Sequence, residues 1–328
     1  MLSQELREIV DQIPVISHDR GYWFVRTEGG LFYNQFVRHG VIAIGYNELT
    51  PEKIAEIIRY ARRPKKALMD YIKKNHPSIK RPGLAASQLL RFLTEIKAGD
   101  IVIIPGINST ELTFGVVTNG TTIRIDFPQE ENQYNCDYLK AKHVDWIKTV
   151  RRSSLNPELY SMFFARQTIV NGQDYATYID STINDIYTKN GKTHLVVRVD
   201  RHQGIYAHHL FNLGLQLLEA TDQFLQENQI DEDTEKVEVK THLNSPGFFE
   251  LAGYATGAVA TVALLLVAVS GGDFVSETLG IKMKTPGILK ALSTYLNEKK
   301  KRELLAQLSA ELQTKEPKDL LEIIKKLK

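Results

Sequence analysis

The chain has 328 residues, enough for two domains, and its apolar and charged fractions of 43% and 24% are those of an ordinary folded protein. The formal charge is only +2, so no global excess of cations argues for a polyanionic partner. The single cysteine, Cys136, excludes an intramolecular disulfide and a cysteine zinc cluster. With no apolar leader in the first fifteen residues, we expect a cytoplasmic or inner-membrane-associated protein in a reducing compartment.

The first third of the chain alternates strand and helix signals. A short amphipathic helix is predicted before Pro14, and apolar runs predict strands near 22–26, 41–46, 101–105 and 113–118. Thr50, Pro51 and Glu52 form a helix start, with an N-cap, a proline at the first helical position and an acid in the first turn. Basic runs at 59–66, 73–74 and 80–81 are explained as well by solvated helix faces as by a binding surface.

Four short motifs occur in a recognisable order. Trp23 and Arg26 open a strand, and the segment 44–49 reads Ile-Gly-Tyr-Asn-Glu-Leu. A helix with Gln88, Arg91 and Phe92 then leads to a Gly-Asp turn at 99–100, and 144–159 is a strand with Trp146 that ends in Arg-Arg-Ser-Ser-Leu-Asn-Pro. In this order the motifs resemble the PUA-like superfamily, specifically the EVE-related domain at the N-terminus of Mrr-like restriction proteins. Tyr46 replaces the tryptophan of that family.

The resemblance implies a mixed β-barrel over residues 1–175 with a ligand cleft at one opening. Such a cleft accepts an extruded, modified base with a stacking aromatic ring, a hydrogen-bonding amide and a phosphate-binding cation. The candidate ligand-binding residues are Trp23, Arg26, Tyr46, Asn47, Gln88 and Arg91. The alternative is structural: the strand aromatics are core residues, and Gln88 and Arg91 cap a loop.

Residues 185–245 read as a small α+β module, with a strand at 194–199, a helix at 206–226 and a strand at 236–240. Glu238 and Lys240 match the Glu-x-Lys pattern of metal-dependent nucleases, and Asp200 ends the preceding strand. An alternating solvent-exposed strand gives the same pattern, so this set is a weak catalytic candidate. The sequence predicts no metal centre and no cofactor.

The character changes in residues 246–328. The run from Leu251 to Val269 contains no charge, which is typical of a membrane-spanning helix or of a buried one. Gly253 and Gly257 form a small-xxx-small pair that favours helix association, so we expect a homo-oligomer through 251–269. Basic amphipathic helices are predicted to follow. The expected fold class is therefore α+β: a PUA-like mixed β-barrel, a small α+β module with a long apolar helix, and C-terminal helices.

Three functions remain open from the sequence. The first is a sensor of nucleic acid or a nucleotide-type ligand with a membrane-associated or oligomerising effector part, in defence against phage by analogy. The second is a divalent-metal-dependent restriction-like nuclease. The third is an oligomeric regulatory protein without a membrane anchor. A non-enzymatic role is favoured over catalysis.

Overall fold

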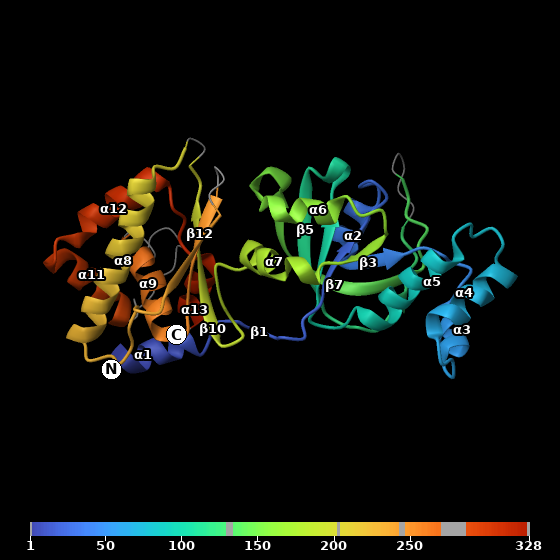
Figure 1. Cartoon of the computed structure of the whole chain (residues 1–328), viewed down its shortest axis with the longest axis horizontal. Helices are drawn as coiled ribbons and strands as arrows, with labels where there is room; N and C mark the ends of the chain where they lie inside the picture. The colour runs from blue at the N-terminus through green and yellow to red at the C-terminus, as the bar shows by residue number, and fades with distance from the viewer. Residues whose placement is uncertain (1, 129–133, 202–203, 243–246, 270–286, 327–328) are drawn as a thin grey trace. The chain divides into compact units, whose positions relative to one another are not determined.

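The structure, a computed structural model, describes residues 2–128, 134–201, 204–242, 247–269 and 287–326. They form two compact units (Figure 1). Unit 1 comprises Met1–His18 and Asn184–Lys328, and unit 2 comprises Asp19–Ile183. Each unit has a sheet of its own.

Unit 2 is built on a sheet with the strand order β3-β7-β5-β4-β2-β8, and β6 pairs with β7 beside this path. Both faces of the sheet are covered at β2. Trp23 and Val25 pack into one apolar cluster, and their neighbours Tyr22 and Phe24 pack into another. Burial on both sides explains why β2 is apolar throughout, whereas much of β7 alternates between buried and exposed residues. The strands are β2 (Tyr22–Val25), β3 (Val41–Ile44), β4 (Ile101–Pro105), β5 (Glu111–Val117), β6 (Ile123–Arg124), β7 (Lys140–Arg151) and β8 (Ile169–Asn171).

Three helices of unit 2 are inserted between β3 and β4: α3 (Pro51–Ile58), α4 (Pro64–Asn75) and α5 (Pro82–Leu90), which continues as a π-helix at Arg91–Glu95. The predicted start of α3 is confirmed, since the Thr50 hydroxyl accepts a hydrogen bond from the Lys53 backbone N–H at 3.2 Å. The three helices pack around their own apolar cluster, which includes Ile54, Leu68 and Leu89. The other helices of unit 2 are α2 (Tyr33–His39), α6 (Tyr160–Phe163) and α7 (Ala176–Ile183), with 3₁₀ turns at Ile107–Ser109, Arg152–Ser154, Pro157–Leu159 and Gln173–Tyr175.

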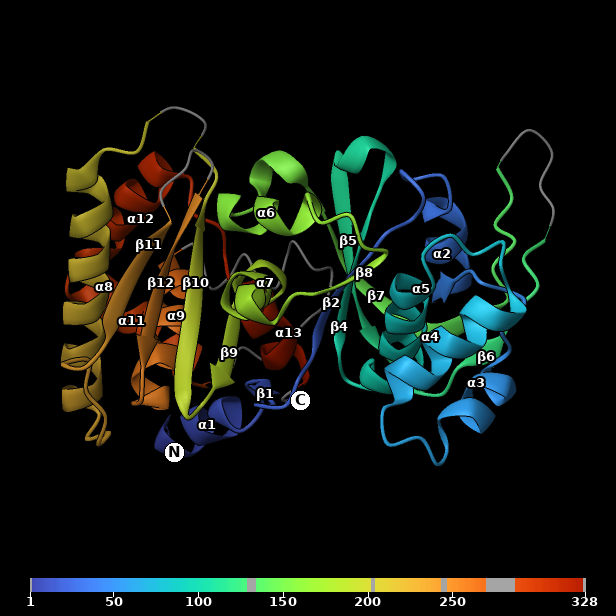
Figure 2. The same cartoon turned by 45° about the vertical axis from the view of Figure 1, so that its right-hand side comes forward.

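Unit 1 is a sheet with helices packed against one face. Its strand order is β1-β9-β10-β12-β11, with β1 parallel to β9 and the other pairs antiparallel. Figure 2 shows α8, α9, α11 and α12 on one side of this sheet. The strands are β1 (Val15–Ile16), β9 (Ile186–Lys189), β10 (Lys192–Val199), β11 (Glu238–His242) and β12 (Gly247–Gly253). The helices are α1 (Leu2–Val10), α8 (Ala207–Glu227), α9 (Thr256–Val269), α11 (Gly287–Glu298), α12 (Lys301–Leu312) and α13 (Lys318–Lys326).

The prediction of one long apolar helix over residues 251–269 is wrong. Residues 251–253 belong to β12, and the helix α9 begins only at Thr256 and has 14 residues. At about 1.5 Å per residue it is about 21 Å long, short of the roughly 30 Å of a bilayer core. Among the residues that the structure describes, no helix is long and apolar enough to cross a membrane.

Helix α9 is instead the centre of unit 1. Every residue from Gly257 to Val269 is buried, and α9 contacts α1, α8, α11 and α12. Gly253 and Gly257 lie in a strand and a helix, so they are not a pair on one helix face. Association of two chains through residues 251–269 stays a prediction. The helix α9 has no exposed face through which a second chain could bind.

The predicted fold class is wrong in two further respects. In the described part of unit 2, the terminal strands β3 and β8 of the sheet do not pair with each other, so the sheet is half of a barrel rather than a closed one. The expected small α+β module is not separate from the apolar segment, because every residue of β12 pairs with β10. Strand pairing between segments this far apart in sequence has no local signature.

Candidate functional site

The predicted ligand-binding residue Trp23 lies in the core. Its side chain is on β2, the residue is 5% exposed, and its indole Nε1 donates a hydrogen bond to Asp100 Oδ2 at 2.8 Å. The same carboxylate accepts the backbone N–H groups of Gly21 at 2.8 Å and Lys97 at 2.9 Å. Asp100 therefore ties the start of β2 to the turn before β4, and Trp23 is one of its three donors.

Gln88 and Arg91 meet at the free edge of β8. The Gln88 Oε1 atom accepts the Ile169 backbone N–H at 2.5 Å, and Arg91 Nη1 donates to the Ile169 carbonyl at 2.9 Å and to Gln167 Oε1 at 2.6 Å. An uncovered strand edge leaves backbone donors and acceptors without partners. These two side chains satisfy those of Ile169. Gln88 is 1% exposed, and its Nε2 atom has no hydrogen-bond partner in the described chain.

Tyr46 and Asn47 lie at the end of β3. The Asn47 amide binds a neighbouring segment twice, donating to the Asp137 carbonyl at 2.6 Å and accepting the Leu139 N–H at 3.1 Å. Tyr46 has a positive φ of 60° and its carbonyl accepts a hydrogen bond from the buried Lys140 ammonium at 2.8 Å. Burial, with a smaller contribution from Glu28, raises the pKa of the Tyr46 hydroxyl.

Arg26 completes the set of six. Its guanidinium donates to the carbonyls of Phe163 at 2.8 Å and Ala165 at 3.0 Å, and it lies 5.8 Å from the centre of the Phe24 ring. The structure thus brings Trp23, Gln88 and Arg91 around β2 and β8, and it places Tyr46 and Asn47 at β3. Four of the six side chains bind backbone atoms of unit 2, and Trp23 binds a buried carboxylate. These contacts give the side chains a structural role, because they connect segments of the fold.

The weak catalytic set on unit 1 is spread along the sheet. Asp200 follows Val199, which pairs with Gly247, whereas Glu238 pairs with Ala252 at the other end of β12. Five residues of strand, at about 3.3 Å each, separate these positions by about 17 Å. Asp200 is bound to Lys315 at 2.8 Å and Glu238 to Lys192 at 2.5 Å.

Lys240 instead lies 3.6 Å from Glu250, a carboxylate that His194 Nδ1 also approaches at 2.6 Å. Each carboxylate of this sheet face is therefore next to a basic side chain. No group of three or more histidine, cysteine or acidic side chains in the described ranges could hold a metal ion.

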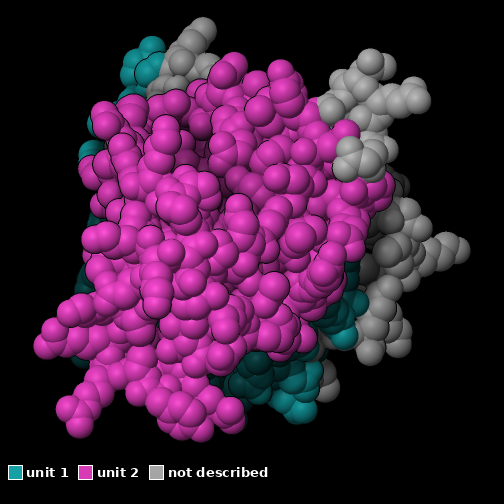
Figure 3. All heavy atoms as spheres, turned by 90° about the vertical axis from the view of Figure 1, so that its right-hand side faces the viewer, with its two compact units in different colours: residues 1–18, 184–328 teal, residues 19–183 magenta. Residues whose placement is uncertain are grey.

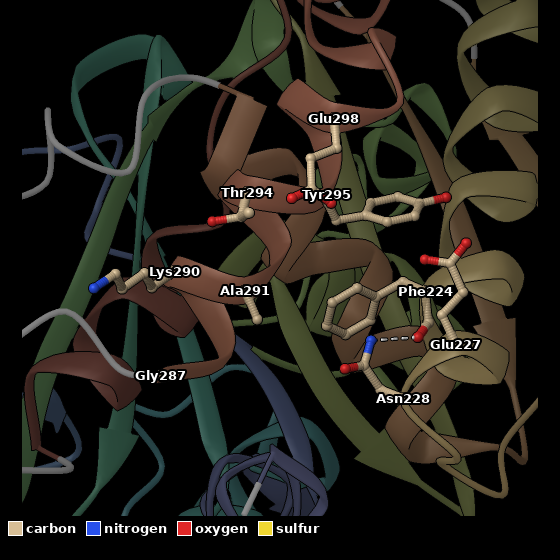
Figure 4. A pocket seen from close by; sticks show the side chains of 9 residues that line it. All are labelled: Phe224, Glu227, Asn228, Gly287, Lys290, Ala291, Thr294, Tyr295 and Glu298. Atoms are coloured by element: carbon tan, nitrogen blue, oxygen red, sulfur yellow. Dashed lines mark hydrogen bonds between the residues drawn. The ribbon is translucent and has the colours of Figure 1, made fainter.

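A shallow cleft of about 440 Å³ lies between α8 and α11 in unit 1 (Figure 4). Three of its polar side chains are bound already: Asn228 Nδ2 donates to the Phe224 carbonyl at 2.8 Å, Glu227 pairs with Lys299 at 2.6 Å, and the Tyr295 hydroxyl donates to Gln223 Oε1 at 3.0 Å. We find no nucleophile with an adjacent base among its lining residues, which are Phe224, Glu227, Asn228, Gly287, Lys290, Ala291, Thr294, Tyr295 and Glu298.

The largest concentration of charge is on the inserted helices of unit 2. Residues 51–90 contain ten lysines and arginines but only three acidic residues, in a chain whose net charge is +2. Among the described residues, only Lys53 of the ten forms an ion pair, with Glu56 at 2.9 Å. The other nine are exposed and pair with no acid in the described chain: Arg59, Arg62, Arg63, Lys65, Lys66, Lys73, Lys74, Lys80 and Arg81. We call these nine residues the basic surface.

The fold gathers the basic surface at the two ends of α4. Five of its members lie in or beside the connection from α3 to α4, and four lie where α4 ends and α5 begins. The nearest members of the two groups within α4 are Lys66 and Lys73, which lie about 10 Å apart along the helix. Figure 3 looks onto the side of unit 2 on which α3 and α4 lie in Figure 1.

The charges at the start of α4 interact unfavourably with the helix dipole. Its N-cap is Arg63 with no capping side chain, and Lys65 and Lys66 follow in a first turn that contains no acid. Cations are unfavourable at the positive end of a helix, by about 0.3–1 kcal/mol each. A sequence selected for stability alone would place acids here, as α3 does with Glu52. This arrangement strengthens the positive potential that the basic surface presents to solvent.

Comparison with known proteins gives a family match for one part of the chain. Residues 24–171 match a family described as a domain of unknown function (DUF8426). The match lies within unit 2 and includes the inserted helices. No curated protein and no solved structure matches the chain. The resemblance of this region to the PUA-like superfamily stays a prediction.

Proposed function

We propose that unit 2 binds nucleic acid and that the basic surface is where the phosphate backbone is held. One observation carries the proposal: nine exposed cations, without acidic partners among the described residues, are concentrated on α4 and its two connections in a nearly neutral chain. Phosphate contacts from lysine and arginine dominate nucleic-acid affinity, because each contact releases condensed counterions. The resemblance to restriction proteins is consistent with unit 2 as a recognition part and unit 1 as the responding part. The contacts of Asp200, Glu238 and Lys240 favour no nuclease reaction.

Salt dependence of binding tests this proposal directly. We would measure fluorescence anisotropy of labelled oligonucleotides with the full chain between about 50 and 200 mM salt. The test variant combines Lys65→Gln and Lys66→Gln. The matched control combines Lys236→Gln and Lys300→Gln, which removes two exposed lysines of unit 1.

If both lysines contact phosphates, the slope of log K against log salt should decrease in magnitude by about 1.4 for a single strand or about 1.8 for a duplex. The control should keep the wild-type slope. The proposal fails if the full chain binds no oligonucleotide at the lowest salt, or if the control and the test variant lose affinity equally.

A further inference from the structure

Tyr60 is the most exposed large apolar or aromatic side chain in the described chain, at 87%. It lies in the short connection between α3 and α4. Other residues of this connection and its flanks contribute to the apolar cluster of the three helices, with Ile54 and Leu68 fully buried. Packing therefore does not explain an aromatic residue at position 60, because the ring contributes almost nothing to that core.

The surroundings of the ring are cationic. The Arg59 guanidinium lies 5.6 Å from the centre of the Tyr60 ring. Arg62 and Arg63 follow within three residues, are exposed, and have no acidic partner in the described chain. An aromatic ring thus stands in solvent beside one arginine, with two more within three residues along the chain. Arginine has a flat guanidinium that binds phosphate in a forked geometry.

We infer that the basic surface takes single-stranded nucleic acid, with one base stacked on Tyr60 and the adjacent phosphates bound by the neighbouring arginines. This inference rests on the proposed function and names its substrate class. In a duplex, the faces of the bases are covered by their neighbours, so an exposed ring on a turn has no base face to stack on. In a single strand the bases are free to stack on aromatic side chains.

The length of the basic surface fits this substrate. Beyond Tyr60, α4 begins at Pro64, and about 14 Å along it the second group of cations begins at Lys73 and continues to Arg81. A strand anchored by a stacked base at one end of α4 can therefore follow phosphate-binding groups to its other end. Stacking on one platform with electrostatic contacts beside it is the arrangement by which single strands are bound without sequence preference.

An anionic membrane surface is the competing partner for a basic patch, and the structure disfavours it. Membrane-binding surfaces combine cations with several apolar side chains that insert between the lipids. Within residues 51–90, Tyr60 is the one large apolar or aromatic side chain that is mostly exposed.

The inference is tested with the full chain, Tyr60→Ala and Tyr60→Phe. The probes are labelled oligothymidine, labelled oligouridine, a hairpin duplex of the same length, and vesicles of phosphatidylcholine with phosphatidylserine. We expect the wild type to bind either single strand at least about tenfold more tightly than the duplex. Tyr60→Ala should weaken single-strand binding by roughly 5- to 150-fold and leave the salt slope unchanged. Tyr60→Phe should retain the wild-type affinity, because it keeps the ring.

The outcomes separate this inference from the proposed function. If the duplex binds as tightly as the single strands and Tyr60→Ala has no effect, while Lys65→Gln with Lys66→Gln lowers the salt slope, stacking is overturned and nucleic-acid binding stands. If only the vesicles bind, both are overturned. Since Tyr60 is exposed, the thermal midpoint of Tyr60→Ala should equal that of the wild type, which shows that any loss of affinity is not a loss of fold.

Discussion

Replacing Trp23 by phenylalanine separates a structural role of the indole from a role in ligand binding. The substitution removes one of the three donors to the Asp100 carboxylate, the Nε1–H at 2.8 Å, and leaves the donors from Gly21 and Lys97. A hydrogen bond to a carboxylate contributes about 1.5–3 kcal/mol net. We expect the free energy of unfolding of unit 2 to fall by about that amount. Nucleic-acid affinity should not change, because Trp23 is only 5% exposed.

Urea unfolding of the full chain measures the effect. The chain has two tryptophans and both lie in unit 2, so Trp146 fluorescence reports on this unit when Trp23 is replaced. The matched control is Trp146→Phe, in which Trp23 is the reporter. Trp146 Nε1 donates to the Phe36 carbonyl, a neutral acceptor, at 3.2 Å, and its loss should lower the free energy of unfolding by only about 0.5–1.5 kcal/mol.

Two results would refute this reasoning. One is a Trp23→Phe variant that is no less stable than Trp146→Phe at an equal dependence on urea. The other is a Trp23→Phe variant of unchanged stability that no longer binds the oligonucleotides, which would show that the indole reaches the ligand.

Three further predictions concern other residues of unit 2. Lys65→Gln with Lys66→Gln should raise the thermal midpoint while weakening nucleic-acid binding, since each cation costs α4 about 0.3–1 kcal/mol; an unchanged or lower midpoint would contradict this. Burial raises the pKa of the Cys136 thiol to about 12, so a disulfide reagent at pH 8 should modify it only after urea unfolding. Burial, partly opposed by Asp100, lowers the pKa of Lys142 from 10.5 to about 8. The unfolded chain then binds more protons between these pH values, so stability should gain up to about 3 kcal/mol from this group as pH rises from 8 to 10.5, and this gain should be absent from the pH profile of Lys142→Met.

The sequence predicts those features of the fold that depend only on neighbouring residues, such as helix starts and apolar strands. The start of α3 follows from Thr50 and Pro51 alone, because capping involves only the first turn. The strands β2, β3, β4 and β5 lie within a few residues of the predicted apolar runs. The run from Leu251 to Val269 was misinterpreted because an uncharged segment has the same composition whether lipid or protein surrounds it. No periodicity marks the point where β12 ends and α9 begins.

The candidate site was harder to predict, for a different physical reason. Residue type says what Gln88 and Arg91 can bind, but not that the backbone of Ile169 lies next to them. For the basic surface, the runs of cations were visible, yet a solvated helix face explained each run equally well. Two features distinguish them: nine cations have no acidic partner among the described residues, and they gather at the two ends of α4. Both depend on the packing of α3, α4 and α5.

Unit 2 is an insertion into unit 1, and this has a consequence for biosynthesis. The parallel neighbours β1 and β9 are joined through the whole of unit 2, residues 19–183. Helix α1, whose buried side chains include Leu6 and Ile9, therefore leaves the ribosome long before α9 and α11, the helices that cover it. At about 5–20 residues per second, unit 2 takes roughly ten to thirty seconds to synthesise. Unit 2 can complete its own sheet near the end of that time, when β8 has been made. The N-terminal segment still has an apolar face, and the helices that bury it have not yet been made.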